Sequence, residues 1–314
     1  MQHSGEAVHR LMAPVGPSSR SLALTAELAR LTQRLAPLAG DHETALPDLR
    51  VHRRNGPTEP LHCIFPLGFA LTTQGHKQVL LGEKVFSYGP GESMLTTIDL
   101  PVAAHITRAT AREPYLGISL AFDATSLARV LTEVELPRVA SVMRFEPLSV
   151  KRLDEPVLDA LVRLLRLLEE PAMLLYVAPL IRQEILVRLL HGPHAAHLAH
   201  LAAAGSPRRQ VADIVTWLKQ HFTEPVAVDE LAERANMSAS TFRQHFRAMT
   251  GMSPVQFQKR LRLQEARQLM LNDGASAAGA SALVGYESAS QFNREYRRLF
   301  GAPPQRDVLH ALSS

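Results

Sequence analysis

The alternation of apolar and polar residues divides the chain into a strand-rich part and two helical parts. From residue 49 to residue 122 the apolar positions form short runs, some continuous and some alternating with polar positions, and Gly75, Gly82 and Pro101 fall between the runs. Runs of this length with turn residues between them are typical of β-strands. Many short strands at regular spacing predict a small antiparallel barrel or sandwich.

Helical spacing of apolar residues precedes and follows this part. Residues 22–38 have it, and it returns after Asp123. A stripe of apolar side chains every three to four positions is the pattern of a helix that packs on a core with one face. The segments predicted to be helical after Asp123 are 124–131, 151–169, 173–190, 210–222, 228–234, 239–249 and 255–271.

These elements predict two domains. Residues 21–190 are expected to form a mainly-β domain with a helical segment, and residues 209–314 an all-α domain. Residues 191–208 are expected to link the two, because Gly192 and later glycine and proline residues interrupt helical structure there. Residues 1–20 are expected to be disordered.

The last third of the chain contains two copies of one pattern, at residues 228–251 and 280–301. Each copy reads as a short helix, a tight turn, a serine and a second helix with polar residues on its outer face. The serines, Ser238 and Ser288, can cap the helices that follow by accepting a backbone N–H bond. This is the pattern of a helix-turn-helix motif. The predicted helix 255–271 would be a rigid spacer, so two recognition helices could enter major-groove segments about 34 Å apart on one side of DNA.

Polar residues on the second helix of each copy are the candidate DNA contacts. An arginine can donate two hydrogen bonds to guanine and a glutamine can pair with adenine, whereas flanking basic residues suit phosphates. The candidates are Ser240, Arg243, Gln244 and Arg247 in the first copy, and Ser290, Gln291, Asn293, Arg294 and Arg298 in the second.

The charge distribution favours double-stranded DNA as the partner. The chain has 34 Lys and Arg against 30 Asp and Glu. Up to Ser206 it has 20 of each kind, whereas from Pro207 onward it has 14 basic and 10 acidic residues, so the whole excess lies in the last third. A basic end on a neutral body suits a protein that contacts phosphates.

Two runs in this basic end carry a family resemblance. LAERANMSASTFRQHFRAMTGMSPVQFQKRLRLQEARQLM, which begins at Leu231, and VGYESASQFNREYRRLFGAPPQ, which begins at Val284, resemble the double helix-turn-helix domain of AraC-type transcriptional regulators. The resemblance implies a role in transcription, with RNA polymerase as a partner. It places the base-reading positions at Ser240, Arg243 and Gln244, and at Ser290, Gln291 and Arg294.

The strand-rich part, from about Thr44 to Leu131, resembles the cupin-like N-terminal domain of one AraC subgroup, notably in QGHKQVLLGEKVFSYGPGESMLTTIDLPV and EPYLGISLAFD. The implied fold is an N-terminal mainly-β cupin-like barrel with flanking helices, followed by a C-terminal all-α domain with two helix-turn-helix motifs joined by a long helix. The resemblance also implies a small-molecule effector that enters the barrel. It implies a homodimer as well, with the helices after Asp123 as the dimer surface.

The first helix of the second motif departs from the family pattern. Residues 276–283 read SAAGASAL, with Gly279 inside, where members usually have bulky apolar residues. Glycine costs a helix about 1 kcal/mol relative to alanine, and small side chains bury less area. We expect a looser second motif that settles on DNA.

The histidines do not form the pattern of a metal-dependent cupin enzyme. Such cupins have two histidines one residue apart, then a glutamate and a later histidine, whereas the nearest strand here reads His76-Lys77-Gln78, and His62 and His105 are scattered. We expect no metal, no cofactor and no enzymatic activity. Two alternatives are a cupin-type enzyme with a DNA-binding tail, which bound metal would reveal, and an effector-independent architectural DNA-binding protein, whose barrel would lack a pocket of about 300 Å³.

Two further groups of residues have two interpretations each. Cys63 is the one cysteine of the chain, so no disulfide can form within it, and its apolar neighbours favour a buried, inert thiol over a sensor thiol. A second group, spaced by three residues, suits a metal stripe or the solvated face of a linker helix. The lack of Asp and Glu beside these residues favours the solvated face. They are His191, His194, His197 and His200.

Neither a membrane nor a secretory location is indicated. No apolar run reaches the roughly 18 residues of a membrane span, and the N-terminus lacks the order of basic, apolar and small residues found in a signal peptide. The sequence therefore predicts a cytoplasmic protein with no membrane partner.

Overall fold

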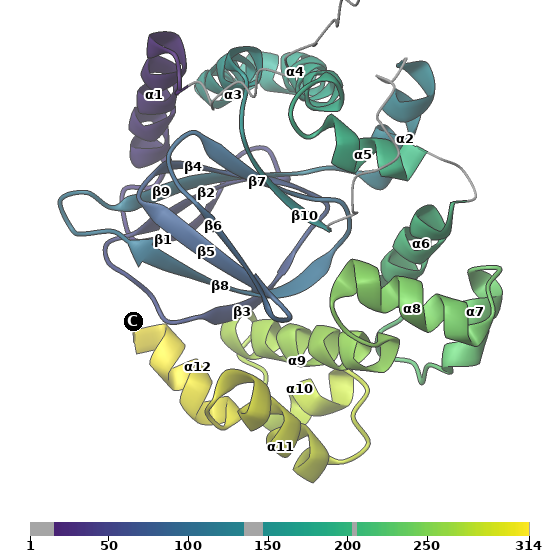
Figure 1. Cartoon of the computed structure of the whole chain (residues 1–314). Coiled ribbons are helices and arrows are strands. Elements are labelled where there is room, and N and C mark those ends of the chain that lie inside the picture. The colour runs from purple at the N-terminus through teal and green to yellow at the C-terminus, as the bar shows by residue number, and fades with distance from the viewer. Residues whose placement is uncertain (1–15, 135–146, 203–205, 314) are drawn as a thin grey trace, which may run out of the picture.

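Two antiparallel β-sheets face each other in the middle of the molecule, with helices on their outer sides (Figure 1). The computed structural model describes residues 16–134, 147–202 and 206–313. One sheet has six strands in the order β1-β2-β9-β4-β7-β10, and the other has four in the order β3-β8-β5-β6. The strands are β1 (Gly40–Glu43), β2 (Leu49–Arg54), β3 (Leu61–Phe65), β4 (Gly68–Gln74), β5 (His76–Leu81), β6 (Lys84–Tyr88), β7 (Glu92–Thr96), β8 (Leu100–Arg108), β9 (Tyr115–Ala121) and β10 (Leu148–Arg152).

The alternation of side chains along a strand explains why both faces of the six-stranded sheet are covered. On β9, Ile118 and Leu120 are buried in a large apolar cluster that also contains residues of the outer helices. Tyr115 lies on the opposite face of the same strand and packs against Ile106 of β8, in the other sheet. A strand with neighbours on both faces is held in one register, because a slip of one residue would exchange the two sets of side chains.

Helices α1 (Ser19–Leu35), α3 (Glu155–Leu167) and α4 (Pro171–His191) lie together on one outer side of the sheets (Figure 1). The Ser18 side chain accepts a bond from the N–H of Ser21, and this cap starts α1 three residues before the predicted start. The expectation of disorder is therefore wrong for Ser19 and Arg20, which lie in α1. Residues 1–15 lie outside the described residues.

The predicted helix 151–169 is wrong in its first part. Residues Leu148–Arg152 form β10, which pairs with β7, and α3 begins only at Glu155. Asp154 occupies the cap position and Pro156 the first turn, where proline needs no donor. A strand at the edge of a sheet and the start of a helix therefore follow each other within a few residues, and apolar spacing alone did not separate them.

The first half of helix α4, residues 171–181, has no charged residue. One side carries Ile181, Ile185 and Leu189 into the apolar cluster under the sheet. The other side exposes Leu175 and Leu180, whose exposed fractions are 82% and 65%. No helix among the described residues, α4 included, is long and apolar enough to cross a membrane.

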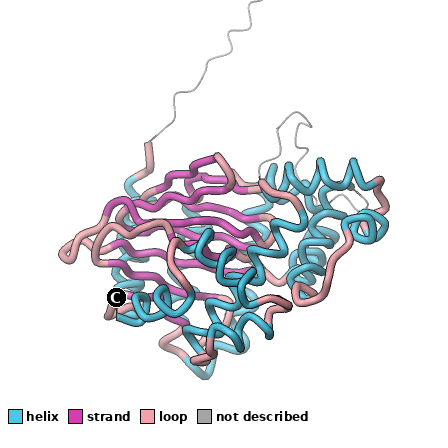
Figure 2. Tube along the Cα trace, turned by 90° about the horizontal axis from the view of Figure 1, so that it is seen from below, coloured by secondary structure: helices cyan, strands magenta, loops and turns pink. Residues whose placement is uncertain are grey.

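The C-terminal domain is all-α and packs on the outer face of the four-stranded sheet, as the view from below shows (Figure 2). This confirms the predicted two-domain architecture. His62 of β3 meets the Phe300 ring edge-on at 6.0 Å, and Lys219 Nζ lies 3.0 Å from Asp99 Oδ1. The helices are α6 (Pro207–Gln220), α7 (Val228–Arg234), α8 (Ala239–Thr250), α9 (Pro254–Asn272), α10 (Ala277–Leu283), α11 (Ala289–Phe300) and α12 (Pro304–Ser313), of which α12 was not predicted.

One apolar cluster runs through both domains without interruption. It contains Val79 and Leu100 from the sheets together with Val211, Phe242 and Phe257 from the C-terminal helices. Burial of apolar surface stabilises a fold by about 25 cal/mol for each Å² removed from water, so this shared cluster stabilises the contact between the domains.

The expected linker 191–208 is partly built into the fold. It contains helix α5 (Ala195–Ala202), which contacts both α4 and α6. The expectation that its histidines form a solvated face is wrong for His194 and His197, which are 0% and 7% exposed. The ring of His194 lies within hydrogen-bond distance of two serine hydroxyls, with Nε2 2.8 Å from Ser93 Oγ and Nδ1 3.1 Å from Ser149 Oγ. The side chain of His200 lies outside the described residues.

The burial of His194 predicts an acid-sensitive contact. Burial, and next the nearby His197, lowers the pKa of His194 from 6.5 to about 3. Below about pH 6.5 the unfolded chain takes up a proton that the folded chain does not, so stability falls as the pH drops from 6.5 toward 3. At 1.36 kcal/mol per unit, the loss at pH 5 is about 2 kcal/mol. His194→Gln is expected to remove this part of the difference in unfolding free energy between pH 7 and pH 5, measured by urea denaturation. The exposed His191→Gln should keep it, and an unchanged difference in His194→Gln would contradict the assignment.

Candidate nucleic-acid interface

The first helix-turn-helix motif consists of α7 and α8. Asn236 in the turn has a positive φ of 51°, a conformation that asparagine tolerates better than most residues. The Ser238 side chain accepts a bond from the N–H of Thr241 at 3.3 Å and caps α8. Phe242 and Phe246 are fully buried. Together these features fix α8 so that its polar face points away from the core.

The second motif, α10 and α11, repeats this construction. The Ser288 side chain accepts from the N–H of Gln291 and caps α11. Gly285 in the turn has a φ of 82°, and a Cβ there would lie 2.3 Å from the carbonyl oxygen of Thr223, so this position requires glycine. Ser276 caps α10, which forms despite its small residues and Gly279. That this motif is looser than the first in the free protein stays a prediction, which faster amide hydrogen exchange of the second motif than of the first would support.

Helix α9 joins the motifs and packs on both. Ser253 and Gln256 form a reciprocal cap at its start. Phe257 and Leu261 belong to the cluster of the first motif, whereas Ala266 and Met270 belong to the core of the second. At 1.5 Å per residue, its 19 residues span about 28 Å. The helix therefore sets both the distance and the rotation between the two recognition helices.

Arg262, on α9, connects the two motifs through backbone carbonyls. Its Nε donates to the Phe222 carbonyl at 2.6 Å, its Nη1 to the Gly285 carbonyl at 2.8 Å, and its Nη2 to the Thr223 carbonyl at 3.0 Å. The first and third acceptors lie in the loop before α7, and the second lies in the turn of the second motif. Gln258, one turn earlier, donates to the Phe222 carbonyl as well. The guanidinium thus lies between the motifs and donates hydrogen bonds to backbone carbonyls of both sides, which need donors where water is excluded.

All nine candidate DNA contacts are exposed on α8 and α11. Arg243 lies 3.6 Å from Asp229 of α7, and Gln291 donates to Glu295 at 3.1 Å. Within the described part of the chain, the side chains of Gln244, Asn293, Arg247, Arg294 and Arg298 have no hydrogen-bond or ion-pair partner. The structure therefore brings the candidates to two accessible helical faces, and their contact with bases stays a prediction.

The pattern analysis missed the residues that hold the second recognition helix. Glu295 of α11 accepts bonds from Lys259 Nζ at 2.6 Å and from the Tyr286 hydroxyl at 2.8 Å. Asp307 of α12 accepts from Arg267 Nε and from the Tyr296 hydroxyl, both at 2.7 Å. Each carboxylate joins residues of different helices, so spacing along one helix gives no signal for either.

Two features of the N-terminal domain concern metal binding and thiol chemistry. Within the described ranges, no group of three or more His, Cys, Asp or Glu residues is placed to hold a metal ion. Cys63 lies among apolar neighbours inside the sheets, and burial raises its pKa to about 11, which keeps the thiol protonated at neutral pH. That environment suits a packing role, and a sensor role for Cys63 has no support in this geometry.

Comparison with known proteins gives matches to both halves. Residues 45–197 match the family model of the AraC-type transcriptional regulator N-terminus, and residues 231–307 match that of a helix-turn-helix domain. The transcriptional activator RhaS of Escherichia coli is 32% identical over 95 residues, which is 30% of this chain and 34% of RhaS. The transcriptional regulator GbdR of Pseudomonas aeruginosa is 32% identical over 108 residues, 34% of this chain and 29% of GbdR.

The chain thus matches about a third of the length of these curated relatives. A crystal structure of an apo variant of ToxT from Vibrio cholerae has a TM-score of 0.58 at 8% identity, over 85% of this chain and 99% of that one. At this identity the match concerns the fold alone. It covers both domains, so the arrangement of a β-rich half before a helical half is shared.

The role of Arg262 predicts a loss of stability that a surface arginine does not share. Arg262→Met keeps the apolar stem and removes the donors to the Thr223 and Gly285 carbonyls, whereas the Phe222 carbonyl keeps its bond from Gln258. Because hydrogen bonds from a charged donor contribute about 1.5–3 kcal/mol, we expect the unfolding free energy to fall by about 2 kcal/mol in urea denaturation. Arg297→Met, on the exposed side of α11, should leave it within about 0.5 kcal/mol. Equal values for the two variants would show that Arg262 does not hold the motifs together.

Proposed function

Because the chain belongs to the AraC family of transcriptional regulators, we propose that it is a sequence-specific DNA-binding regulator controlled by a small-molecule effector in its N-terminal domain. The observation that carries the proposal is the pair of exposed recognition helices, α8 and α11, fixed to one spacer helix. Such a regulator binds a promoter as a homodimer and acts there with RNA polymerase, in the cytoplasm.

The exposed polar faces support direct reading of bases. Arg243 and Arg294 would each donate two bonds to a guanine, and Gln244 would pair with adenine. Arg243 must first leave Asp229, which costs little, because an exposed ion pair contributes only about 0–1 kcal/mol. Arg247 and Arg298 lie farther along their helices and would bind phosphates.

We propose a regulator rather than an enzyme. The curated relatives named above are transcriptional regulators. Two histidines of the N-terminal domain have packing contacts: His62 lies against Phe300, and the ring of His194 is within hydrogen-bond distance of two serine hydroxyls. An effector would then act by binding one arrangement of the two domains better than another.

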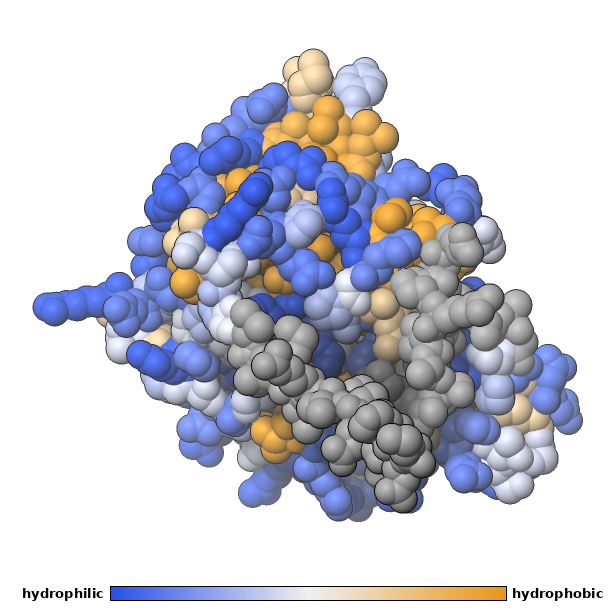
Figure 3. Space-filling view, turned by 45° about the horizontal axis from the view of Figure 1, so that its top comes forward, coloured by the Kyte–Doolittle hydropathy of each residue, from blue (hydrophilic) through white to orange (hydrophobic). Residues whose placement is uncertain are grey.

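The apolar outer face of α4 supports the homodimer. Met173, Leu175, Tyr176 and Leu180, in the first half of α4, are all about half exposed or more. Figure 3, which brings the top of the molecule forward, shows hydrophobic residues gathered at the top, where α4 lies in Figure 1. Contiguous apolar residues on a surface mark an interaction site, and a helix that meets its own copy buries the same residues twice.

Two classes of substitution test the DNA contacts. Arg243→Ala or Arg294→Ala is expected to weaken binding to the preferred site by about 1–3 kcal/mol and to relax the preference at one base. Arg247→Ala or Arg298→Ala is expected to weaken specific and random DNA alike and to flatten the dependence of affinity on salt. Fluorescence anisotropy with a selected site and a scrambled duplex, at several salt concentrations, measures both.

Arg306→Ala, an exposed basic residue of α12, is the control for charge alone. Equal losses on selected and scrambled DNA for Arg243→Ala would contradict its base-reading role. A protein that selects no sequence from a random library would overturn the proposed function itself.

The dimer surface has a separate test. Leu175→Glu with Leu180→Glu places two charges in the proposed interface, where unpaired charges are costly. We expect the mass in analytical ultracentrifugation to fall from dimer to monomer. Leu38→Glu, at a residue that is 73% exposed elsewhere on the domain, should leave the dimer intact. A dimer that survives the double change would place the interface on another surface.

A further inference from the structure

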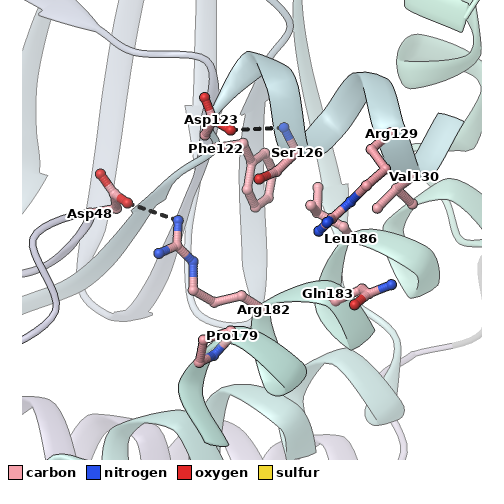
Figure 4. A pocket seen from close by; sticks show the side chains of 10 residues that line it. All are labelled: Asp48, Phe122, Asp123, Ser126, Arg129, Val130, Pro179, Arg182, Gln183 and Leu186. Atoms are coloured by element: carbon pink, nitrogen blue, oxygen red, sulfur yellow. Dashed lines mark hydrogen bonds and ion pairs between the residues drawn. The ribbon is translucent and has the colours of Figure 1, made fainter. Parts of the chain in front are cut away.

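A cavity of about 210 Å³ opens between α2 (Ala124–Glu133), α4 and the loop before β2 (Figure 4). The sequence predicted that an effector enters the barrel, whereas this cavity lies outside the barrel, under the helices of the same domain. Its volume is below the range of about 300–1,000 Å³ that is usual for drug-sized ligands. A molecule that fills it is therefore small.

The lining combines an apolar floor with one guanidinium that has no partner. Phe122, Val130 and Leu186 supply apolar surface. Arg182 is already paired, because its Nη2 lies 2.8 Å from Asp48 Oδ2. Arg129 has no hydrogen-bond or ion-pair partner for its side chain among the described residues, and in Figure 4 that side chain extends from α2 toward Leu186 on α4.

This combination selects a class of ligand. The unpaired Arg129 guanidinium offers two parallel donors, the geometry that fits a carboxylate. The lining carries two aspartates beside its two arginines, so it has no net charge to attract a dianion such as phosphate. The apolar floor fits a short hydrocarbon or aromatic body. We propose that this cavity is the effector site and that it binds a small organic monocarboxylate, held between Arg129 of α2 and the side of α4.

The packing around the cavity connects it to the DNA-binding half. Val130 and Leu186, which line the cavity, belong to the same apolar cluster as Leu198 of α5. Ala212 of α6 packs against this cluster and also against the cluster that contains the core of the first helix-turn-helix motif. A ligand that draws α2 toward α4 changes the surface on which α5 and α6 rest.

Helix α4 has a weak point at the cavity. Pro179, inside α4, lines the cavity. A proline inside a helix removes one backbone hydrogen bond and favours a bend. The neighbouring Leu180 belongs to the apolar outer face described above. A ligand on the inner side of α4 therefore acts on the helix that also carries the proposed dimer surface.

The experiment uses the full chain and three probes: benzoate, the neutral benzamide of nearly the same size and shape, and the smaller inorganic phosphate. Isothermal titration calorimetry without DNA measures binding. We expect benzoate to bind at millimolar concentration or below, and the other two probes to bind at least about tenfold more weakly. Benzamide cannot form the charge-assisted bond, and phosphate has no apolar body for the floor and meets a lining without net charge. Arg129→Gln removes the guanidinium, and Gln183→Trp, an exposed residue at the rim, fills the opening. Each is expected to weaken benzoate about tenfold or more, while Arg188→Gln, on the same helix and paired with Glu184, should not.

That the bound carboxylate acts as an effector rests on the proposed function. A failure of the binding site can be distinguished from a failure of that function. No binding of benzoate, equal binding of the three probes, or benzoate binding that both cavity variants leave unchanged would overturn the site. In each of these cases, selective DNA binding by the same preparation would still support the proposed function as a regulator. If benzoate binds at the cavity and also shifts the affinity for a selected DNA site, the shift should vanish in Arg129→Gln. A shift that persists in that variant would place the effector site elsewhere.

Discussion

The hydrogen bonds from Arg262 to carbonyls of both helix-turn-helix units hold the two recognition helices in one relation to each other. The core of the second unit is small, with seven buried hydrophobic residues among those described. Burial lowers the pKa of Arg262, and its nearest partners are carbonyl oxygens rather than a carboxylate. A guanidinium suits this position because its donors form a rigid planar fork. The relation of α8 to α11 thus depends on this side chain as well as on the packing of α9.

Local rules predicted the parts of the site that depend on neighbours in sequence. Ser238 and Ser288 cap their helices, because this role involves atoms only a few residues away. The carbonyl partners of Arg262 lie 23 to 40 residues from it, so no local pattern indicates them. The predicted start of α3 was wrong for a related reason. Residues Leu148–Arg152 form a strand because they pair with β7, which is distant in sequence.

The burial of His194 also depends on residues that are distant in sequence. Four histidines at a spacing of three residues, with glycine and proline nearby, are typical of a solvated connection. Here the ring of His194 fits between Ser93 of β7 and Ser149 of β10, two strands that come together only in the folded sheet. The connection between the domains is therefore part of the core, and a change in the helices of the first domain reaches α6 through packed side chains rather than through a loose tether.

The continuous apolar cluster across the two halves limits how this protein can be taken apart or recombined. A fragment that begins at Pro207 would present to water the side chains of α6 and α9 that now lie against the four-stranded sheet, and such fragments tend to aggregate. Exchange of sensor halves between related regulators meets the same barrier, since the outer face of the new sheet must match the helices it receives. The two halves are therefore expected to change together during evolution. Their shared surface restricts which sensor domains and DNA-binding domains can be combined by domain exchange.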